Sequence, residues 1–375
     1  MVNFNVSNVE GKMVMKKVAF LINSMAGGGA ERVVSVLLKN LSREGRQFYL
    51  ILLQDKIYYD IPEDIEIIKL NSKFFGWLKL GKIIKENNID KVISFLGRSN
   101  YTNIFAKKTG HKVCISERIN PSPMHTFSVT GINGLINRYL VKKLYKKVDS
   151  IFTNSLGTMN SLNQDFGIDR NKIKVVYNPL DLGKIKNSCQ DDLELEYKEI
   201  FKNPVIINVG RLTKQKGQDD LIRSFKIIKK EIPESKLVIL GEGELKRKLK
   251  RLVKKLGLEE NVFFLGWQKN PFKFISQSKV FVLSSLWEGL PNTLMEAMAC
   301  GTPVVSTDCP SGPDEIIDNN ENGILVPLND QKALMSAITR ILKNPAFAKE
   351  ISQNAKKKVE NFSVQKIISQ YEKIV

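Results

Sequence analysis

Histidine and cysteine are scarce in this chain of 375 residues, which has two histidines and four cysteines. The cysteines, at positions 114, 189, 300 and 309, never approach CxxC spacing. Because zinc sites draw on these two residue types, a zinc site would have almost no ligands in this chain. The widely spaced thiols indicate a reduced protein in the cytoplasm rather than a disulfide-linked secreted domain.

Long apolar runs are absent as well. No run of about 18 apolar residues occurs, and residues 1–15 lack the basic segment and apolar run of a signal peptide. We therefore expect neither secretion nor a membrane-spanning helix. Acidic residues are outnumbered by basic ones, which gives a formal net charge of +19 at pH 7, most of it in residues 1–185. This charge favours an anionic partner: nucleic acid, an acidic lipid surface or a phosphorylated substrate.

Short apolar segments alternate with segments of helical periodicity along the chain. The apolar segments are residues 18–22, 49–53, 92–96, 113–116 and 151–154, then 205–209, 237–240, 262–265, 280–283 and 304–306. Continuous apolar runs indicate strands buried on both faces, and the alternation indicates parallel sheets. A hydrophilic stretch at 184–202 separates the two series. We predict an α/β protein with two doubly wound domains, residues 1–182 with an extension at 1–14, and residues 183–360, facing across a cleft.

Two loops that follow predicted strands could hold an anion. Gly27, Gly28 and Gly29 precede the first helix, where bare backbone amides can approach a phosphate or a sugar. The same glycines could form a tight turn without a ligand, and they match neither the dinucleotide fingerprint nor the Walker loop. Arg211 and Lys216 lie five positions apart in a later loop. They could neutralise a diphosphate, or they could be solvated loop charges.

A third loop, after the apolar segment at 280–283, carries two glutamates. Glu288 lies in the loop, and Glu296 lies inside a helix that Gly301 ends. Amides at the start of this helix would face an anion. The stretch of main chain concerned is Gly289, Leu290, Pro291, Asn292 and Thr293. The two carboxylates could be the acid and base of a hydrolase, acceptors for sugar hydroxyls, or ordinary surface groups.

Together these segments resemble the family-4 retaining glycosyltransferases of the GT-B architecture. The resemblance rests on the GGAER run at 28–32, the segment 175–181, NxGRLxxQKG at 208–217, GEGEL at 241–245, and EGLPNxLxE at 288–296 with its continuation to 305. Two glutamates separated by seven residues are a hallmark of that group. The resemblance implies two Rossmann-like domains, with a C-terminal helix at 361–375 that packs back on the first domain.

The resemblance also implies an activity. A hexose or N-acetylhexosamine would pass from a UDP-sugar to a saccharide acceptor, with retention, without a metal and with no cofactor. The catalytic candidates are Glu288 against the donor sugar, and Arg211 and Lys216 on the diphosphate. The donor-binding candidates are Glu296 on the ribose, the loop residues 289–293, Gly28 and Gly29 closing over the donor, and the main chain of Gly266 and Trp267 holding the base. Preorganised cations and amide dipoles would stabilise the departing diphosphate.

One departure from the family lies in the first domain. Many relatives carry a donor-contacting histidine there, whereas this chain has Arg118 at the corresponding place. Arg118 and His125 are therefore candidates for contact with substrate on the acceptor side. A subgroup with a Ser-Glu-Arg-Asn-like run is similar to this chain, and a plain loop without a substrate contact is the alternative.

Residues 132–148 combine an apolar stripe with basic side chains. The stripe consists of Leu135, Ile136, Tyr139, Leu140 and Leu144, and the basic residues are Arg138, Lys142, Lys143, Lys146 and Lys147. This pattern predicts a helix on an anionic membrane surface, although an amphipathic helix covering the sheet has the same pattern. We hypothesise a lipid-linked saccharide acceptor, a role in surface glycan synthesis, and a peripheral location on the inner face of the cell membrane.

Three other functions are less well supported by the sequence. The charge would suit a nucleic-acid-binding protein, but no recognition fold or aromatic platform accompanies it, so we expect no nucleic acid partner. An inactive glycosyltransferase-like scaffold is disfavoured by the full set of Arg211, Lys216, Glu288 and Glu296. A dehydrogenase is disfavoured because neither glycine-rich turn has the dinucleotide fingerprint.

Overall fold

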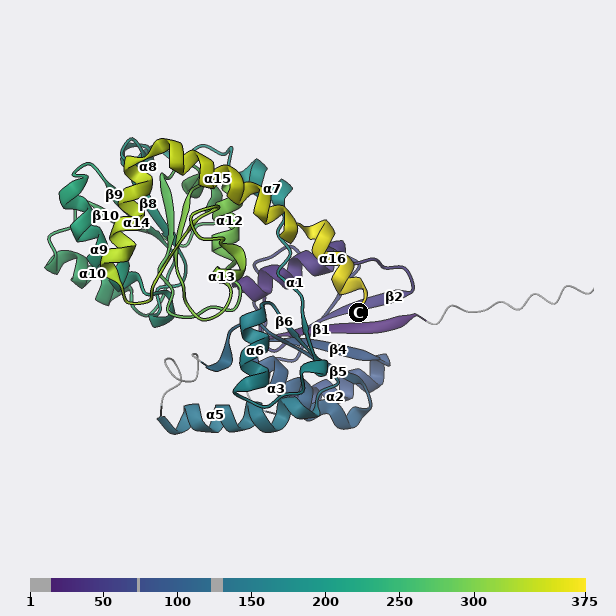
Figure 1. Cartoon of the computed structure of the whole chain (residues 1–375). Coiled ribbons are helices and arrows are strands. Elements are labelled where there is room, and N and C mark those ends of the chain that lie inside the picture. The colour runs from purple at the N-terminus through teal and green to yellow at the C-terminus, as the bar shows by residue number, and fades with distance from the viewer. Residues whose placement is uncertain (1–14, 73–74, 123–130) are drawn as a thin grey trace, which may run out of the picture. The chain divides into compact units, whose positions relative to one another are not determined.

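The structure is a computed structural model that describes residues 15–72, 75–122 and 131–375 (Figure 1). The predicted extension at 1–14 lies outside these residues. The chain divides into two compact units, one formed by the residues up to Ile115 together with Val375, and the other by Ser116–Ile374. The domain boundary that the sequence predicts, between 182 and 183, stays a prediction.

The first sheet has the strand order β3-β2-β1-β4-β5-β6-β7. Its strands are β1 (Lys16–Ile22), β2 (Arg46–Leu52), β3 (Glu66–Lys69), β4 (Lys91–Phe95), β5 (Lys112–Glu117), β6 (Ser150–Thr153) and β7 (Ile173–Val175). The helices between them are α1 (Gly29–Asn40), α2 (Gly76–Asn87), α3 (Gly97–Phe105), α5 (Gly131–Leu144) and α6 (Leu156–Gln164). Strand β1 pairs in parallel with both β2 and β4, as the alternation of strands and helices predicts.

The second sheet has the order β10-β9-β8-β11-β12-β13. Its strands are β8 (Val205–Val209), β9 (Lys236–Leu240), β10 (Val262–Gly266), β11 (Val280–Leu283), β12 (Val304–Thr307) and β13 (Ile324–Val326). The helices are α7 (Leu182–Ser188), α8 (Leu195–Phe201), α9 (Gln218–Glu231), α10 (Lys246–Lys255), α11 (Phe272–Ser276), α12 (Asn292–Cys300), α13 (Pro313–Ile316), α14 (Gln331–Lys343), α15 (Pro345–Val359) and α16 (Val364–Glu372). The pairs along this sheet are parallel, and the order is that of a doubly wound Rossmann sheet.

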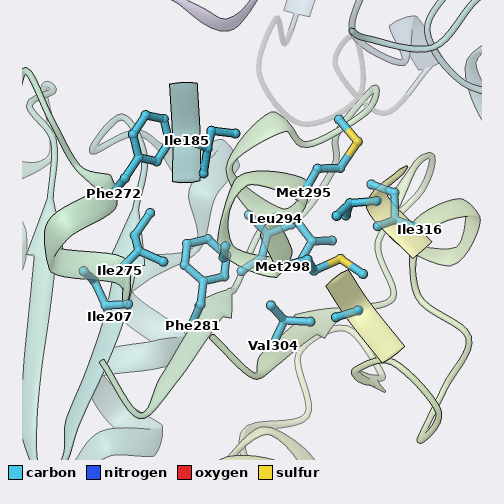
Figure 2. Packing of buried hydrophobic residues seen from close by; sticks show 14 of the residues in the cluster. Ile185, Ile207, Phe272, Ile275, Phe281, Leu294, Met295, Met298, Val304 and Ile316 are labelled. Atoms are coloured by element: carbon cyan, nitrogen blue, oxygen red, sulfur yellow. The ribbon is translucent and has the colours of Figure 1, made fainter. Parts of the chain in front are cut away.

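Both faces of the second sheet are buried. One hydrophobic core contains Val205, Ile207, Val238 and Leu240, and the other contains Ile206, Leu237 and Ile239. This alternation is the two-residue period of a strand with a helix layer on each side. Figure 2 shows Leu294 and Met298 of α12 lying in the first of these cores beside Phe281 of β11. The helix that carries Glu296 is therefore fixed to the sheet by its apolar side.

The predicted central strands and the α/β fold are confirmed. The strands β3, β7 and β13 were not among the predicted segments, and all three lie at sheet edges. Helix α12 begins at Asn292 with Pro291 as its N-cap, and Gly301 ends it, as predicted, in the left-handed conformation at φ 79°. Among the described residues, no helix is both long and apolar enough to cross a bilayer.

Adjacent isoleucines on α9 allow a test of the second core. Ile228 is fully buried, whereas 37% of Ile227 is exposed. We expect Ile228→Ala to lower the free energy of unfolding by about 2 to 5 kcal/mol, because it removes buried methyl groups and leaves a cavity. Ile227→Ala is the matched control and should cost less than about 1 kcal/mol. Urea denaturation measures both, and equal losses would contradict this packing.

Candidate active site

The strand order of the second sheet reverses between β8 and β11. Loops that leave two such strands at their carboxyl ends run to opposite faces, and the crevice between them is the usual ligand site of this fold. The loop after β8 contains Arg211 and Lys216, and the loop after β11 contains Glu288. Two motifs that are 72 positions apart in the sequence thus meet at one edge of the sheet.

The centre of this edge is an ion pair between Lys216 and Glu288. Lys216 Nζ lies 2.5 Å from Glu288 Oε1, and only 14% and 8% of the two side chains are exposed. Ser285 Oγ donates to the same carboxylate oxygen at 2.6 Å, and Gln215 Nε2 donates to the other oxygen at 3.4 Å. The Glu288 carboxylate is therefore held by groups from both loops.

The backbones of the two loops are also joined directly. Ser284 Oγ donates to the Lys216 carbonyl at 2.8 Å, and the Leu286 amide donates to the Gln215 carbonyl at 2.7 Å. Gly217 has a positive φ of 57°, and a Cβ atom there would lie 2.1 Å from the Ser284 carbonyl oxygen. Only glycine permits both this conformation and this close approach.

Arg211 is the exposed member of the group. Its Nη2 donates to Gln215 Oε1 at 3.4 Å, and its carbonyl accepts from Gln218 Nε2 at 3.0 Å. Gln215 and Gln218 thus hold Arg211 within its own loop, and its exposed guanidinium remains accessible to a ligand.

Helix α12 brings the second glutamate and an amide end to the same region. Glu296 is 2% exposed. At the N-terminal end of the helix, Asn178 Nδ2 donates to Asn292 Oδ1 at 2.5 Å, and Leu290 and Pro291 are buried. The Thr293 hydroxyl oxygen is buried and has no hydrogen-bond partner within the described part of the chain. A buried hydroxyl in this state is costly unless something else binds it, which is consistent with a ligand at this end of α12.

Gly289 is covered by the segment that follows β5. Ile119 forms an antiparallel bridge with Gly289, and the Asn120 amide donates to the Glu288 carbonyl at 3.1 Å. A Cβ atom at Gly289 would lie 2.1 Å from the Arg118 carbonyl oxygen. Gly289 therefore contacts protein here, and its predicted contact with a donor stays a prediction.

The remaining donor candidates lie elsewhere. Gly266 ends β10, which is separated from β8 by one strand, and 60% of Trp267 is exposed. Gly28 and Gly29 belong to the first unit, where Gly28 is the N-cap of α1 and its carbonyl accepts from Tyr59 Oη at 3.2 Å. Their predicted roles stay predictions.

The two acceptor-side candidates have different outcomes. His125 lies outside the described residues. Arg118 is buried, and its Nη1 donates to Tyr371 Oη of α16 at 3.3 Å.

Glu117 was not among the predicted site residues. It is also buried, and it accepts from Tyr145 Oη at 2.7 Å. Burial raises the pKa of the Glu117 carboxyl. Its position at the carboxyl end of a predicted strand, where ligands bind in this fold, could have marked Glu117 as a candidate.

The predicted membrane-contact helix, α5, divides its apolar residues between two sides. Leu144 is buried, so it is not part of an exposed stripe, and this part of the prediction is wrong because the residue packs into the protein interior. Three other residues are exposed, with Leu135 at 70%, Ile136 at 50% and Tyr139 at 59%. The basic side chains are exposed as well, namely Arg138, Lys142, Lys143, Lys146 and Lys147.

Comparison with known proteins decides the family. Residues 27–184 match the model described as Glycosyltransferase Family 4, and residues 194–358 match Glycosyl transferases group 1. A Campylobacter jejuni relative, named N-acetylgalactosamine-N,N'-diacetylbacillosaminyl-diphospho-undecaprenol 4-alpha-N-acetylgalactosaminyltransferase, is 36% identical over 94% of this chain and 97% of its own length. The chain belongs to the family-4 glycosyltransferases.

Other members of this family and of its fold resemble the chain. A second Campylobacter jejuni relative is 27% identical over 96% of this chain and 98% of its own length. Its name describes an alpha-1,4-N-acetyl-D-galactosaminyltransferase whose acceptor contains diNAcBac-PP-undecaprenol. The crystal structure of Anabaena HepE with UDP and glucose superposes with a TM-score of 0.82 at 20% identity, covering 96% of this chain and 99% of that one. The fold of this glycosyltransferase is thus GT-B.

The Lys216–Glu288 pair can be tested by a double-mutant cycle. We expect Lys216→Met to cost about 3 kcal/mol of unfolding free energy, because it leaves the Glu288 carboxylate buried without its counter-ion. Adding Glu288→Gln should recover part of this loss, which urea denaturation of the four proteins measures. The exposed Lys202–Glu199 pair, also at 2.5 Å, is the matched control and should couple by less than about 1 kcal/mol. If the losses of unfolding free energy from the two single substitutions simply added in the double variant, the pairing of Lys216 with Glu288 would be contradicted.

Proposed function

We propose that this glycosyltransferase moves a hexose or N-acetylhexosamine from a UDP-sugar to a lipid-linked saccharide, with retention at the anomeric carbon. The observation that carries the proposal is the meeting of Arg211, Lys216, Glu288 and the amide end of α12 at the switch point of the second sheet. Each of these groups suits one part of a nucleotide sugar.

The donor end of the proposal rests on charge. A diphosphate carries negative charge that Arg211 and Lys216 can neutralise, and the α12 N-terminus adds its positive dipole. The Thr293 hydroxyl, which forms no hydrogen bond with any described residue, can supply one to the ligand. Glu296 would accept from the ribose hydroxyls. The Anabaena neighbour crystallised with UDP and glucose supports a uridine nucleotide as the donor class.

The proposed chemistry follows from the same groups. Breaking the bond between the sugar and the diphosphate places negative charge on the leaving group and positive charge on the sugar ring. Arg211 and Lys216 stabilise the first, and the Glu288 carboxylate fixes the position of the Lys216 ammonium. In a retaining route, the acceptor hydroxyl attacks from the side of the leaving group, and a diphosphate oxygen takes its proton. The two cations supply the positive charge, so this route needs neither a metal nor a histidine base.

The acceptor end rests on the relatives and on α5. The names of both Campylobacter jejuni relatives contain an undecaprenol diphosphate, which is a lipid carrier. In this chain, α5 presents Leu135, Ile136 and Tyr139 to solvent beside its basic side chains. An exposed apolar group among cations suits the interface of an anionic bilayer. We propose that α5 holds the enzyme on the inner face of the cell membrane, where it extends a surface glycan.

UDP binding tests the donor site. We expect Arg211→Ala and Glu296→Ala each to weaken UDP binding at least about tenfold, since each removes a charge-assisted contact worth about 1.5 to 3 kcal/mol. Titration calorimetry measures the affinity, and Arg223→Ala, at an exposed arginine of α9, is the matched control that should bind as the wild type does. Unchanged binding by both site variants would show that the nucleotide binds elsewhere. Tight UDP binding without sugar transfer to any acceptor would favour an inactive scaffold.

Vesicle sedimentation tests the membrane contact. We expect replacement of Lys142, Lys143, Lys146 and Lys147 by Glu to abolish pelleting with phosphatidylglycerol vesicles, because each lysine contributes about 1 kcal/mol at an anionic surface. The control reverses four exposed cations of α10, Arg247, Lys248, Lys250 and Arg251, whose neighbours Leu249 and Val253 are buried. That variant has the same net charge and should still pellet. If both variants lost pelleting equally, the binding would come from the net charge of the protein and not from α5.

A further inference from the structure

Two cysteines lie side by side at the ends of two neighbouring helices. Cys189 is the C-cap of α7, and Cys300 is the last residue of α12. Their Sγ atoms are 3.1 Å apart, although the residues are 111 positions apart in the sequence. Both side chains are partly exposed, whereas Cys114 and Cys309 are buried. A small solute can therefore reach the pair.

The surroundings of the pair distinguish the two sulfurs. A hydrogen bond with the Cys300 thiol lowers the pKa of Cys189, and Ser276 and the Lys356 ammonium act in the same direction. The pKa of Cys300 is raised by its hydrogen bond to Cys189 and by burial. Lys356 belongs to α15, and its side chain crosses Gly301, where a Cβ atom would lie 2.6 Å from Nζ. Cys189 is therefore the sulfur that ionises more readily, and the thiolate is the form that reacts with oxidants.

We propose that Cys189 and Cys300 form a reversible oxidation site, in which a hydroperoxide converts the two thiols into an intramolecular disulfide. The Cys189 thiolate attacks the O–O bond of the peroxide and becomes a sulfenic acid. Cys300 then attacks that sulfur and releases water. For hydrogen peroxide the balance is two thiols and one peroxide giving one disulfide and two waters. A dithiol reductant reverses the reaction, so the pair is reduced in an unstressed cytoplasm.

The site acts on the helix that carries Glu296. Helices α7 and α12 are in contact (Figure 1), and Asn178 Nδ2 already holds the first residue of α12 through Asn292 Oδ1. A disulfide at Cys300 would add a covalent tie at the last residue of α12. Oxidation would thus fasten α12 at both ends to the segment 178–189 and restrict its movement.

Peptide mapping tests the proposal on the full chain. The protein is treated with hydrogen peroxide, its remaining thiols are alkylated, and its digest is examined by mass spectrometry. We expect a peptide pair linked through Cys189 and Cys300 that dithiothreitol separates, while Cys114 stays alkylatable. In Cys300→Ser, Cys189 should give a sulfenic acid that dimedone traps, and no internal link. Cys114→Ser is the matched control and should form the link as the wild type does.

Hydrogen exchange provides the second measurement. In the oxidised protein, amides of residues 292–300 should exchange several-fold more slowly than in the reduced protein, and reduction should restore the faster exchange. The proposal is overturned if the disulfide joins other cysteines, or if wild-type Cys189 accumulates as sulfinic acid. It is also overturned if Cys189 and Cys300 can still be alkylated when the peroxide has already oxidised Cys114. These measurements use neither UDP nor an acceptor, so their outcome is independent of the proposed sugar transfer.

Discussion

The ion pair between Lys216 and Glu288 is the interaction on which the site depends. It joins two loops that leave the second sheet at β8 and β11, and it lies almost entirely out of solvent. A charge in such a place is tolerated only when it is paired and hydrogen-bonded. Ser285 and Gln215 complete the coordination of the carboxylate, so the ammonium is held where the strand order opens the crevice. The two side chains thus fix each other's position at this edge of the sheet.

The sheets explain why the chemistry lies in loops. Their central strands are covered on both faces, so that the strand side chains are occupied by packing. The groups left for a ligand are those just beyond the carboxyl ends. In the second unit these include two cations, two glutamates and an amide end of a helix, which is a suitable environment for a leaving diphosphate. The fold therefore supplies the frame, and the loop residues determine the reaction.

The sequence allowed prediction of whatever depends on local pattern. The central strands were predicted because burial on both faces makes them continuous apolar runs. The edge strand β3 reads Glu-Ile-Ile-Lys and is only partly buried, so its pattern is weak. The family resemblance implied that Lys216 and Glu288 both lie at the donor, whereas their direct contact with each other was not predicted. Nor could spacing show that Arg118 reaches Tyr371 or that Cys189 meets Cys300, since such contacts depend on how segments distant in the sequence pack.

Gly217 illustrates how a position can matter without touching substrate. Its hydrogen atom occupies the space where any other residue would bring a methyl group against the Ser284 carbonyl oxygen. A bulkier residue would push apart the loops that present Lys216 and Glu288. A survey of inactivating substitutions would consequently rank Gly217 with the residues that contact substrate. Only an assay of folding would distinguish this structural glycine from them.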